Sequence, residues 1–303
     1  MKAILFVGHG SKDPEGNSQV LQFIENMKSG WDPSLLIEAC FLEFERPTVS
    51  QGIDNCVEKG AKEVIVIPIM LLPAGHSKIH IPAAIDDAKQ KYSHVSFTYG
   101  KPIGVHEEIF GILKTRLVEI GENPDEPMAD TAILLLGRGG SDPDANSDLY
   151  KISRLLWEKT NYKFVEPAFM GVTDPLVEEG VERCIKLGAK KVIILPYFLF
   201  TGILIKRLEE MITKFQGLHP DITFELAGYF GFHPNLLTIL QERAREALQG
   251  EVRMNCDICQ YRLDAMEHIE HHHHDHDHDH DHDHDHNHDH HHSHEEKKAG
   301  GLI

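Results

Sequence analysis

The hydrophobic positions along this chain fall into short continuous runs that alternate with amphipathic segments. Residues 3–7, Ala-Ile-Leu-Phe-Val, form the first run, which is too short for a buried helix and fits a strand covered on both faces. Regular alternation of strand and helix is typical of an α/β fold with a parallel sheet. In the first half, we expect strands at about 2–8, 35–41, 63–69 and 94–99, and helices at about 15–29, 46–60, 79–91 and 105–120.

An internal repeat with an offset near 128 residues divides the chain. The turn Gly8-His9-Gly10 that ends the first run returns as Gly137-Arg138-Gly139, and residues 60–68 return at 188–196. Two matching blocks in one register indicate a duplication. We therefore expect two flavodoxin-like parallel-sheet domains, each with strand order 2-1-3-4, which places the first and third strands side by side.

Changes in composition along the sequence predict that the chain has four parts. The first repeat occupies residues 1–122, and a charged, turn-rich stretch with two prolines precedes the second repeat at 130–250. Residues 251–264 carry a Cys-x-x-Cys element, and residues 265–303 are rich in histidine. This last part holds 11 of the 48 acidic and 2 of the 30 basic residues, which leaves 37 acidic and 28 basic residues, or −9, on residues 1–264.

Charge and hydropathy exclude several classes of protein. An acidic body without a basic stripe argues against nucleic acid as a partner. No apolar run approaches the roughly 20 residues of a membrane span, and the N-terminal run lacks a signal-peptide cleavage site, so we expect no membrane association and a cytoplasmic location. The five cysteines are an odd number, and the first three lie in apolar or helical segments, which predicts reduced thiols.

Three polar side chains follow three successive strands of the first repeat. His9 follows the first strand, Glu43 the second and His76 the third. Because the carboxyl ends of parallel strands share one edge of the sheet, we expect His9 and His76 to face each other beside Glu43. Two imidazoles and a carboxylate can bind a divalent metal or move protons near neutral pH. No phosphate-binding fingerprint follows a strand, so we expect no organic cofactor.

The second repeat lacks all three of these polar groups. A role in the scaffold would require them in both copies, so their restriction to one copy indicates a single active site in the first half. When the two repeats are aligned, Arg138 matches His9, Gly171 matches Glu43 and Leu204 matches His76.

The Gly-His-Gly-Ser opening at 8–11, the Glu43 loop and the Pro-Ala-Gly-His-Ser loop at 73–77 resemble those of the class II tetrapyrrole chelatases. Specifically, the chain is similar to long CbiX-type sirohydrochlorin cobaltochelatases over both repeats and the C-terminal appendages. The resemblance implies a class II chelatase-like fold and a lyase that inserts Co²⁺ into sirohydrochlorin in anaerobic cobalamin biosynthesis, a branch of porphyrin biosynthesis.

The resemblance also implies roles for individual residues. His9 and His76 would bind the metal and assist its insertion, and Glu43 would supply the carboxylate. Metal insertion must remove two N–H protons from the ring, which suits groups that titrate near neutral pH. Arg138 cannot ligate a cation, and we expect it to bind the carboxylate arms of sirohydrochlorin, with Ser11 as a second substrate contact. His80 receives no role beyond that of a capping or surface residue.

Cys256 and Cys259 form the Cys-x-x-Cys element. Two thiolates can share one soft metal, but zinc and iron–sulfur sites usually need four ligands. The resemblance implies an iron–sulfur element, completed by other ligands or shared between two chains of a dimer. A redox-inert pair is the alternative.

Residues 271–294 contain 15 of the 23 histidines, most of them alternating with aspartate. Such a segment cannot form a packed core and should be disordered without metal. Imidazole beside carboxylate predicts many modest sites for Co²⁺, Ni²⁺ or Zn²⁺, which suits storage or delivery of metal near the active site. A purely solubilising tail is the alternative.

Several functions stay open at this point. The first is cobalt insertion, with iron insertion for sirohaem as a close variant, because Co²⁺ and Fe²⁺ can accept the same ligands. The second is a non-catalytic cobalt or nickel store. His9 and His76 favour an enzyme, because the tail alone would suffice for a store. The tail favours cobalt, because a scarce ion benefits more from a local reservoir.

Overall fold

The computed structural model describes residues 1–250, and within them each strand is followed by a helix. The first half contains β1 (Lys2–Gly8), α1 (Pro14–Lys28), β2 (Leu36–Phe41), α2 (Val49–Glu58), β3 (Glu63–Ile69), a π-helical turn η1 (His76–His80), α3 (Ile81–Lys91), β4 (Ser96–Tyr99) and α4 (Glu107–Glu119). The second half contains β5 (Met128–Gly137), α5 (Pro143–Glu158), β6 (Tyr162–Phe169), α6 (Val177–Lys186), β7 (Lys191–Pro196), α7 (Ile203–Leu218), β8 (Thr223–Leu226) and α8 (Pro234–Leu248).

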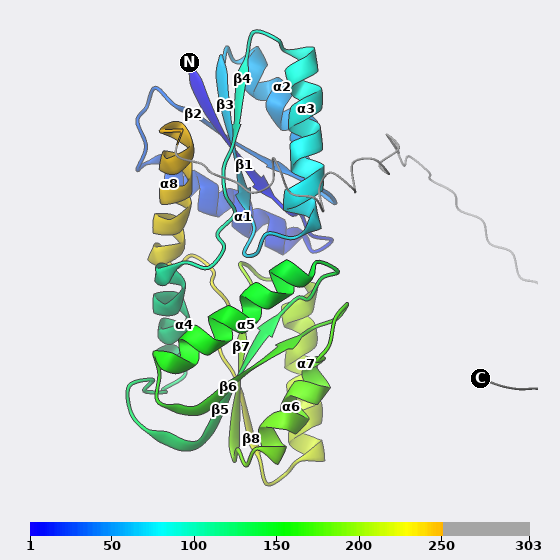
Figure 1. The fold of residues 1–303 in the computed structure, drawn as a ribbon, viewed down its shortest axis with the longest axis vertical. Helices are drawn as coiled ribbons and strands as arrows, with labels where there is room; N and C mark the ends of the chain where they lie inside the picture. The colour runs from blue at the N-terminus through cyan, green and yellow to red at the C-terminus, as the bar shows by residue number, and fades with distance from the viewer. Residues whose placement is uncertain (251–303) are drawn as a thin grey trace, which may run out of the picture. The chain divides into compact units, whose positions relative to one another are not determined.

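The strands form two four-stranded parallel sheets with helices on both faces (Figure 1). Their order is β2-β1-β3-β4 in the first sheet and β6-β5-β7-β8 in the second, which confirms the α/β fold and the strand order predicted from the sequence. β1 lies between β2 and β3, so the loops that follow these three strands emerge together at one edge. The Cys-x-x-Cys element and the histidine-rich tail predicted to be disordered lie outside the described residues.

The strands are apolar throughout because both of their faces are covered. Every residue from Ala3 to Val7 in β1 is fully buried. Side chains alternate between the two faces of a strand, and accordingly Ile4 and Phe6 belong to a different apolar cluster from Leu5. The cluster that holds Ile4 and Phe6 also includes Ile133 of β5, so the two halves share one core.

The two halves exchange their last helices, which the sequence repeat did not reveal. α8 of the second half packs against β3 and β4 of the first sheet, while α4 of the first half packs against β7 and against α8. Figure 1 shows α8 beside the first sheet. Arg243 of α8 donates hydrogen bonds to the carbonyls of Pro102 (3.1 Å) and Ile103 (2.9 Å), and Arg116 of α4 donates one to Phe230 (2.6 Å). Each sheet is therefore covered in part by the other half of the chain.

Two helix starts differ from the sequence-based expectation. The helix expected from residue 46 begins at Val49, because Thr48 caps it: the Thr48 hydroxyl accepts a hydrogen bond from the Gln51 amide, and the Gln51 side chain accepts one from the Thr48 amide. The helix expected from residue 79 is preceded by η1, which begins at His76. Short π-helical turns often occur at functional sites, and this one carries a candidate metal ligand.

Burial fits the predicted roles of the cysteines. Cys40, Cys56 and Cys184 are free and buried, and desolvation raises the pKa of Cys56 and of Cys184 to about 12, so these thiols are uncharged and packed as apolar groups. No helix within residues 1–250 has the length and apolar character needed to cross a bilayer. The cytoplasmic location stays a prediction.

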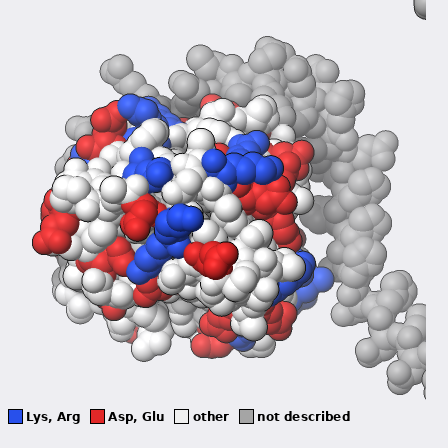
Figure 2. All heavy atoms as spheres, turned by 90° about the horizontal axis from the view of Figure 1, so that it is seen from below, with Lys and Arg blue, Asp and Glu red and all other residues white. Residues whose placement is uncertain are grey.

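The charged side chains are mixed in sign on the face of the molecule that Figure 2 displays, where Lys and Arg lie among Asp and Glu. Opposite charges at such short range cancel much of each other's field beyond about 10 Å at ordinary ionic strength. On this face, an anionic ligand would therefore meet local side chains and not a uniform field.

Candidate active site

The candidate site lies where the loops after β1, β2 and β3 meet. The amide of Glu43 donates a hydrogen bond to the carbonyl of His9 at 3.1 Å, which holds the first two loops together. Gly10 makes this contact feasible: its φ is +88°, and a Cβ at this position would lie 1.7 Å from the carbonyl oxygen of Glu43. The glycine after the first histidine is thus required by the close approach of two loops.

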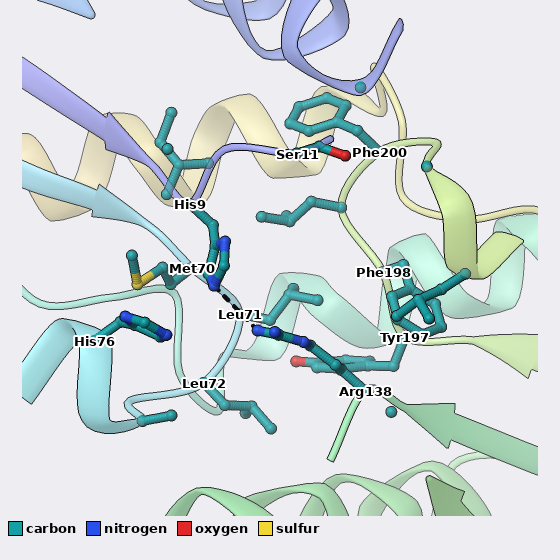
Figure 3. Close-up of a pocket in the computed structure, with 18 of the residues that line it drawn as sticks. His9, Ser11, Met70, Leu71, Leu72, His76, Arg138, Tyr197, Phe198 and Phe200 are labelled. Atoms are coloured by element: carbon teal, nitrogen blue, oxygen red, sulfur yellow. Dashed lines mark hydrogen bonds between the residues drawn. The ribbon is translucent and has the colours of Figure 1, made fainter. Parts of the chain in front are cut away.

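His9, Glu43 and His76 lie together, as the strand order predicted. One ligand atom from each residue lies within 4.8 Å of the others, and His9 Nε2 is 3.4 Å from Glu43 Oε1. The rings of His9 and His76 are 4.8 Å apart between centroids and nearly perpendicular, and both extend into the same space (Figure 3). Ligand atoms about 2.1 Å from one metal ion lie about 3 to 3.5 Å apart, so a small adjustment would let these three groups share a divalent ion.

The hydrogen bonds of His9 define its tautomer. Nδ1 is 3.0 Å from the carbonyl oxygen of Gly10, which can only accept, so Nδ1 carries the proton and Nε2 carries the lone pair. Arg138 Nη1 donates to that lone pair at 3.0 Å. Burial lowers the pKa of His9, and Arg138 acts in the same direction, while the Gly10 carbonyl and Glu43 oppose them. His9 is therefore a neutral imidazole whose Nε2 faces the site.

His76 is also held in its neutral form. Burial lowers its pKa, and the neighbouring His9 and His80 lower it further. The ring of His80 lies 4.9 Å from that of His76, although its side chain is exposed and makes no capping hydrogen bond to α3. His80 is thus a neighbour of the site, and a spacing of four residues brings two side chains to one face of an ordinary helix as well.

A cavity of about 520 Å³ opens beside His9 and His76, between the two halves. His9, His76, Ser11 and Arg138 line it, so four predicted site residues meet there, and Glu43 lies at its edge through its contact with His9. The apolar residues that line the cavity were not identified from the sequence. Several of them follow β7, and the run of aromatic residues there is the only feature of the sequence that could have indicated them. These apolar residues include Phe44. Figure 3 labels six others, namely Met70, Leu71, Leu72, Tyr197, Phe198 and Phe200.

Phe44 forms part of the rim of the cavity. Its side chain is 54% exposed, and its backbone has φ of +62°, a left-handed conformation that is uncommon for a bulky residue. Val172 occupies the matching position of the second half with φ of +71°. Strained backbone of this kind costs on the order of 1–3 kcal/mol and is concentrated at functional loops.

Ser11 is engaged in the local structure of its loop. Its hydroxyl oxygen accepts a hydrogen bond from the Asp13 amide at 3.0 Å, and Asn17 closes the loop from the other side by donating to the Ser11 carbonyl at 2.8 Å. Asp13 caps α1, because its side chain accepts a hydrogen bond from the Glu15 amide. The bond from Asp13 does not use the proton of the Ser11 hydroxyl, and Ser11 lines the cavity.

Two ion pairs connect the halves across the site in a nearly symmetric way. Lys78 of η1 lies 2.8 Å from Asp142, the cap of α5, and Lys206 of α7 lies 2.7 Å from Asp13, the cap of α1. Each lysine follows the third strand of its own half and reaches the first loop of the other. Both side chains of the first pair are buried, with 9% and 5% exposed, whereas in the second pair Asp13 is 9% exposed but Lys206 is 55% exposed.

Lys78→Met is expected to lower the free energy of unfolding by about 3 kcal/mol, because it leaves Asp142 buried without its partner. The matched variant Lys206→Met should cost about 1 kcal/mol, since water can replace an exposed ammonium group. Urea denaturation followed by circular dichroism measures both. Equal losses in the two variants would contradict this ranking.

Comparison with known proteins identifies the family of this chain. The sequence model of the CbiX family matches residues 3–120 and again 132–247. The sirohydrochlorin cobaltochelatase of Priestia megaterium is 73% identical over 90% of this chain and 88% of its own length. The sirohydrochlorin ferrochelatase of the same organism is 38% identical over 83% of this chain and 92% of its own length.

Solved structures give the same family. The structure of SirB from Bacillus subtilis with Fe³⁺ superimposes with a TM-score of 0.72 at 34% identity, covering 82% of this chain and 97% of SirB. A cobalt complex of the sirohydrochlorin chelatase SirB from Bacillus subtilis subspecies spizizenii gives 0.70 at 32% identity with the same coverage. A match over both halves, joined to a relative this similar, means that the chain belongs to the CbiX family.

Proposed function

We propose that this protein is a sirohydrochlorin cobaltochelatase, an enzyme that inserts Co²⁺ into sirohydrochlorin for cobalamin biosynthesis. The observation that carries the proposal is the set His9, Glu43 and His76, which is compact enough for one divalent ion and opens onto a cavity of about 520 Å³. A metal store would need no such cavity. The family and the high identity to a cobaltochelatase support the reaction.

The first task of the site is to hold the incoming ion after it has lost part of its water shell. His9 Nε2 and His76 offer neutral imidazole nitrogens, which suit Co²⁺, and Glu43 offers a carboxylate that offsets part of its charge. Three protein ligands leave the remaining coordination positions open. The pyrrole nitrogens of the substrate would occupy these positions as the ion moves into the ring.

The second task is to remove two protons from the pyrrole nitrogens. Glu43 can accept one of them, because its carboxylate is 35% exposed and adjoins the ligand cluster. An imidazole released from the ion can accept the other, because its ordinary pKa is near neutral. As the metal leaves the protein ligands, these ligands become bases at the moment when protons must be taken up.

The third task is to hold the macrocycle. Apolar side chains such as Leu71, Leu72 and Phe198 offer surface for the ring, and Arg138 and Ser11 offer donors for its carboxylate arms. The ligands come from the first half and much of the apolar surface comes from the second. This division of labour explains how a duplicated chain can keep one active site.

Two observations favour cobalt over iron as the physiological metal. The relative with 73% identity is named a cobaltochelatase, whereas those at 38% and 35% are named ferrochelatases. The histidine-rich tail would concentrate a scarce ion. The ligand set itself would accept either ion.

The decisive experiment mixes purified protein, sirohydrochlorin and Co²⁺ and follows the absorption spectrum of the tetrapyrrole. We expect conversion well above the spontaneous rate, and a slower reaction with Fe²⁺ under anaerobic conditions. If conversion were no faster than without protein, the proposed enzyme activity would be refuted and a metal-storage function would remain as the alternative. A faster reaction with Fe²⁺ would make the protein a ferrochelatase.

We further propose that residues 265–303 bind divalent metal ions and deliver them to the site. Deleting these residues should leave kcat nearly unchanged at saturating Co²⁺ but lower the rate several-fold at limiting Co²⁺, because tethered sites raise the local metal concentration. Rates measured over a range of buffered Co²⁺ concentrations test this. An equal loss at every concentration would contradict delivery by the tail.

We also propose that Cys256 and Cys259 take part in an iron–sulfur cluster, whose remaining ligands come from elsewhere in the chain or from a second copy in a dimer. Anaerobically purified protein should then show a visible absorption band that Cys256→Ser with Cys259→Ser abolishes, while circular dichroism stays unchanged. Wild-type protein without iron or acid-labile sulfide would refute the cluster. Sedimentation velocity of both proteins tests whether a dimer depends on it.

A further inference from the structure

Arg138 occupies the coordination position of His9 that a metal ion needs. Its Nη1 donates a hydrogen bond to His9 Nε2 at 3.0 Å (Figure 3). The other ring nitrogen of His9, Nδ1, donates to the Gly10 carbonyl. Nε2 has a single lone pair. As long as this hydrogen bond exists, His9 cannot ligate Co²⁺.

The guanidinium also takes the electrostatic place of the ion. His9 Nε2 and Glu43 Oε1 are both acceptors and lie only 3.4 Å apart, an arrangement that a cation between or beside them stabilises. Arg138 supplies that positive charge, and it forms no ion pair with any Asp or Glu among residues 1–250. Its side chain is exposed toward the cavity, so a carboxylate entering the cavity can reach it.

We propose that Arg138 is an interlock that couples substrate binding to metal binding. In the free enzyme it blocks His9; when sirohydrochlorin enters, a carboxylate arm draws the guanidinium away and releases His9 Nε2 for Co²⁺. The proposal deepens the proposed function and rests on it. Its consequence is that each ligand raises the affinity of the enzyme for the other, so that Co²⁺ binds His9 more tightly once sirohydrochlorin is present.

The exchange of partners is favoured by the chemistry of arginine. A guanidinium can form two parallel charge-assisted hydrogen bonds with a carboxylate, whereas it forms one neutral-acceptor bond with an imidazole. The substrate therefore offers a stronger partner than His9 does. Because a ligand can shift such an equilibrium only through its different affinity for the two states, this difference is what opens the metal site.

The backbone around Arg138 makes a side-chain movement sufficient. The loop that carries Arg138 is tied to η1 by the buried ion pair of Asp142 with Lys78, and η1 carries His76. This ion pair restrains the spacing of the two loops. The flexible arginine side chain is the part that can exchange partners without moving the ligands.

The test measures Co²⁺ occupancy at His9 itself, so that metal bound elsewhere in the full-length chain does not interfere. Diethylpyrocarbonate modifies neutral imidazoles, and mass spectrometry of the peptide that contains His9 reports the extent of its modification. Co²⁺ is buffered with a chelator, which fixes the free concentration. The free Co²⁺ that protects half of His9 is compared for wild type, Arg138→Ala, Arg138→Gln and Lys12→Ala without substrate.

We expect Arg138→Ala to reach half-protection at a free Co²⁺ concentration at least about tenfold below that of the wild type, because neither the hydrogen bond nor the charge remains. Arg138→Gln, which keeps a donor without charge, should lie between them. Lys12→Ala is the matched control: Lys12 lines the same cavity, but it lies over the Phe44 ring, 5.3 Å from its centroid, and contacts no histidine. In Lys12→Ala, the free Co²⁺ concentration that protects half of His9 should shift by less than about threefold.

A purely structural role of Arg138 predicts a different result. It would weaken the binding of metal and substrate together, whereas the interlock predicts tighter metal and weaker substrate binding in the same variant. If His9 were half-protected at the same free Co²⁺ concentration in wild type and in Arg138→Ala, the interlock would be refuted, while the proposed metal site would stand. No protection of His9 by Co²⁺ in any variant would refute both the interlock and the proposed metal site.

Discussion

Alanine in place of His9 or of His76 is expected to lower kcat for cobalt insertion by about 100-fold or more at saturating sirohydrochlorin. Under the proposed mechanism, each change removes one of three metal ligands and a base that takes up a ring proton. Because both losses affect the chemical step, kcat should fall more than the affinity for sirohydrochlorin. Initial rates of spectral conversion at buffered Co²⁺ give both quantities.

His94→Ala is the matched control for these variants. His94 is exposed and precedes β4, so it lies at the amino end of the first sheet, opposite the edge that carries His9. Its replacement should leave kcat unchanged. If His9→Ala and His76→Ala both retained wild-type turnover, the active site would lie outside the first half, and the site assignment would fall.

Arg138→Ala is expected to raise the KM for sirohydrochlorin by about 10- to 100-fold and to change kcat by less than about threefold. The range corresponds to the loss of one charge-assisted contact, about 1.5–3 kcal/mol. Turnover is largely spared because a guanidinium neither ligates a cation nor accepts a proton at neutral pH. Steady-state kinetics with sirohydrochlorin as the varied substrate separates the two constants.

Lys12→Ala again serves as the control, because Lys12 supplies a similar charge to the same cavity without touching His9. It should raise KM much less than Arg138→Ala does. A tenfold loss of kcat in Arg138→Ala with unchanged KM would contradict a role in substrate binding. It would place Arg138 among the groups that act on the metal or on the protons.

Much of the candidate site could be predicted from the residues alone. Short apolar runs followed by polar loops located His9, Glu43 and His76, and the right-handed connections of parallel sheets placed the first and third strands side by side. The match between the repeats also holds in detail. The amide of Gly171 donates to the carbonyl of Arg138 at 3.2 Å, just as that of Glu43 donates to His9 at 3.1 Å.

Other features escaped prediction because they depend on contacts between distant parts of the chain. The aromatic run that begins at Tyr197 resembles an ordinary strand end until the second half brings it to the cavity. The place of His80 is different in kind, because it lies only four residues from His76 and a helical spacing already brings the two rings close. His80 received no role from the sequence because a histidine at this spacing is also compatible with an ordinary surface position.

The sequence by itself determined the duplication, the α/β fold and the three loops that carry His9, Glu43 and His76, because hydrophobic periodicity, short connections and chain chirality act locally. Only the tertiary structure decided that α4 and α8 change places, that Lys78 and Lys206 bridge the halves, and that Arg138 closes the lone pair of His9. His9 and Arg138 are 129 residues apart, and their meeting depends on how the two halves pack around a shared core. No periodicity within either repeat encodes that packing, since the side chains that produce it are buried by the other half of the chain.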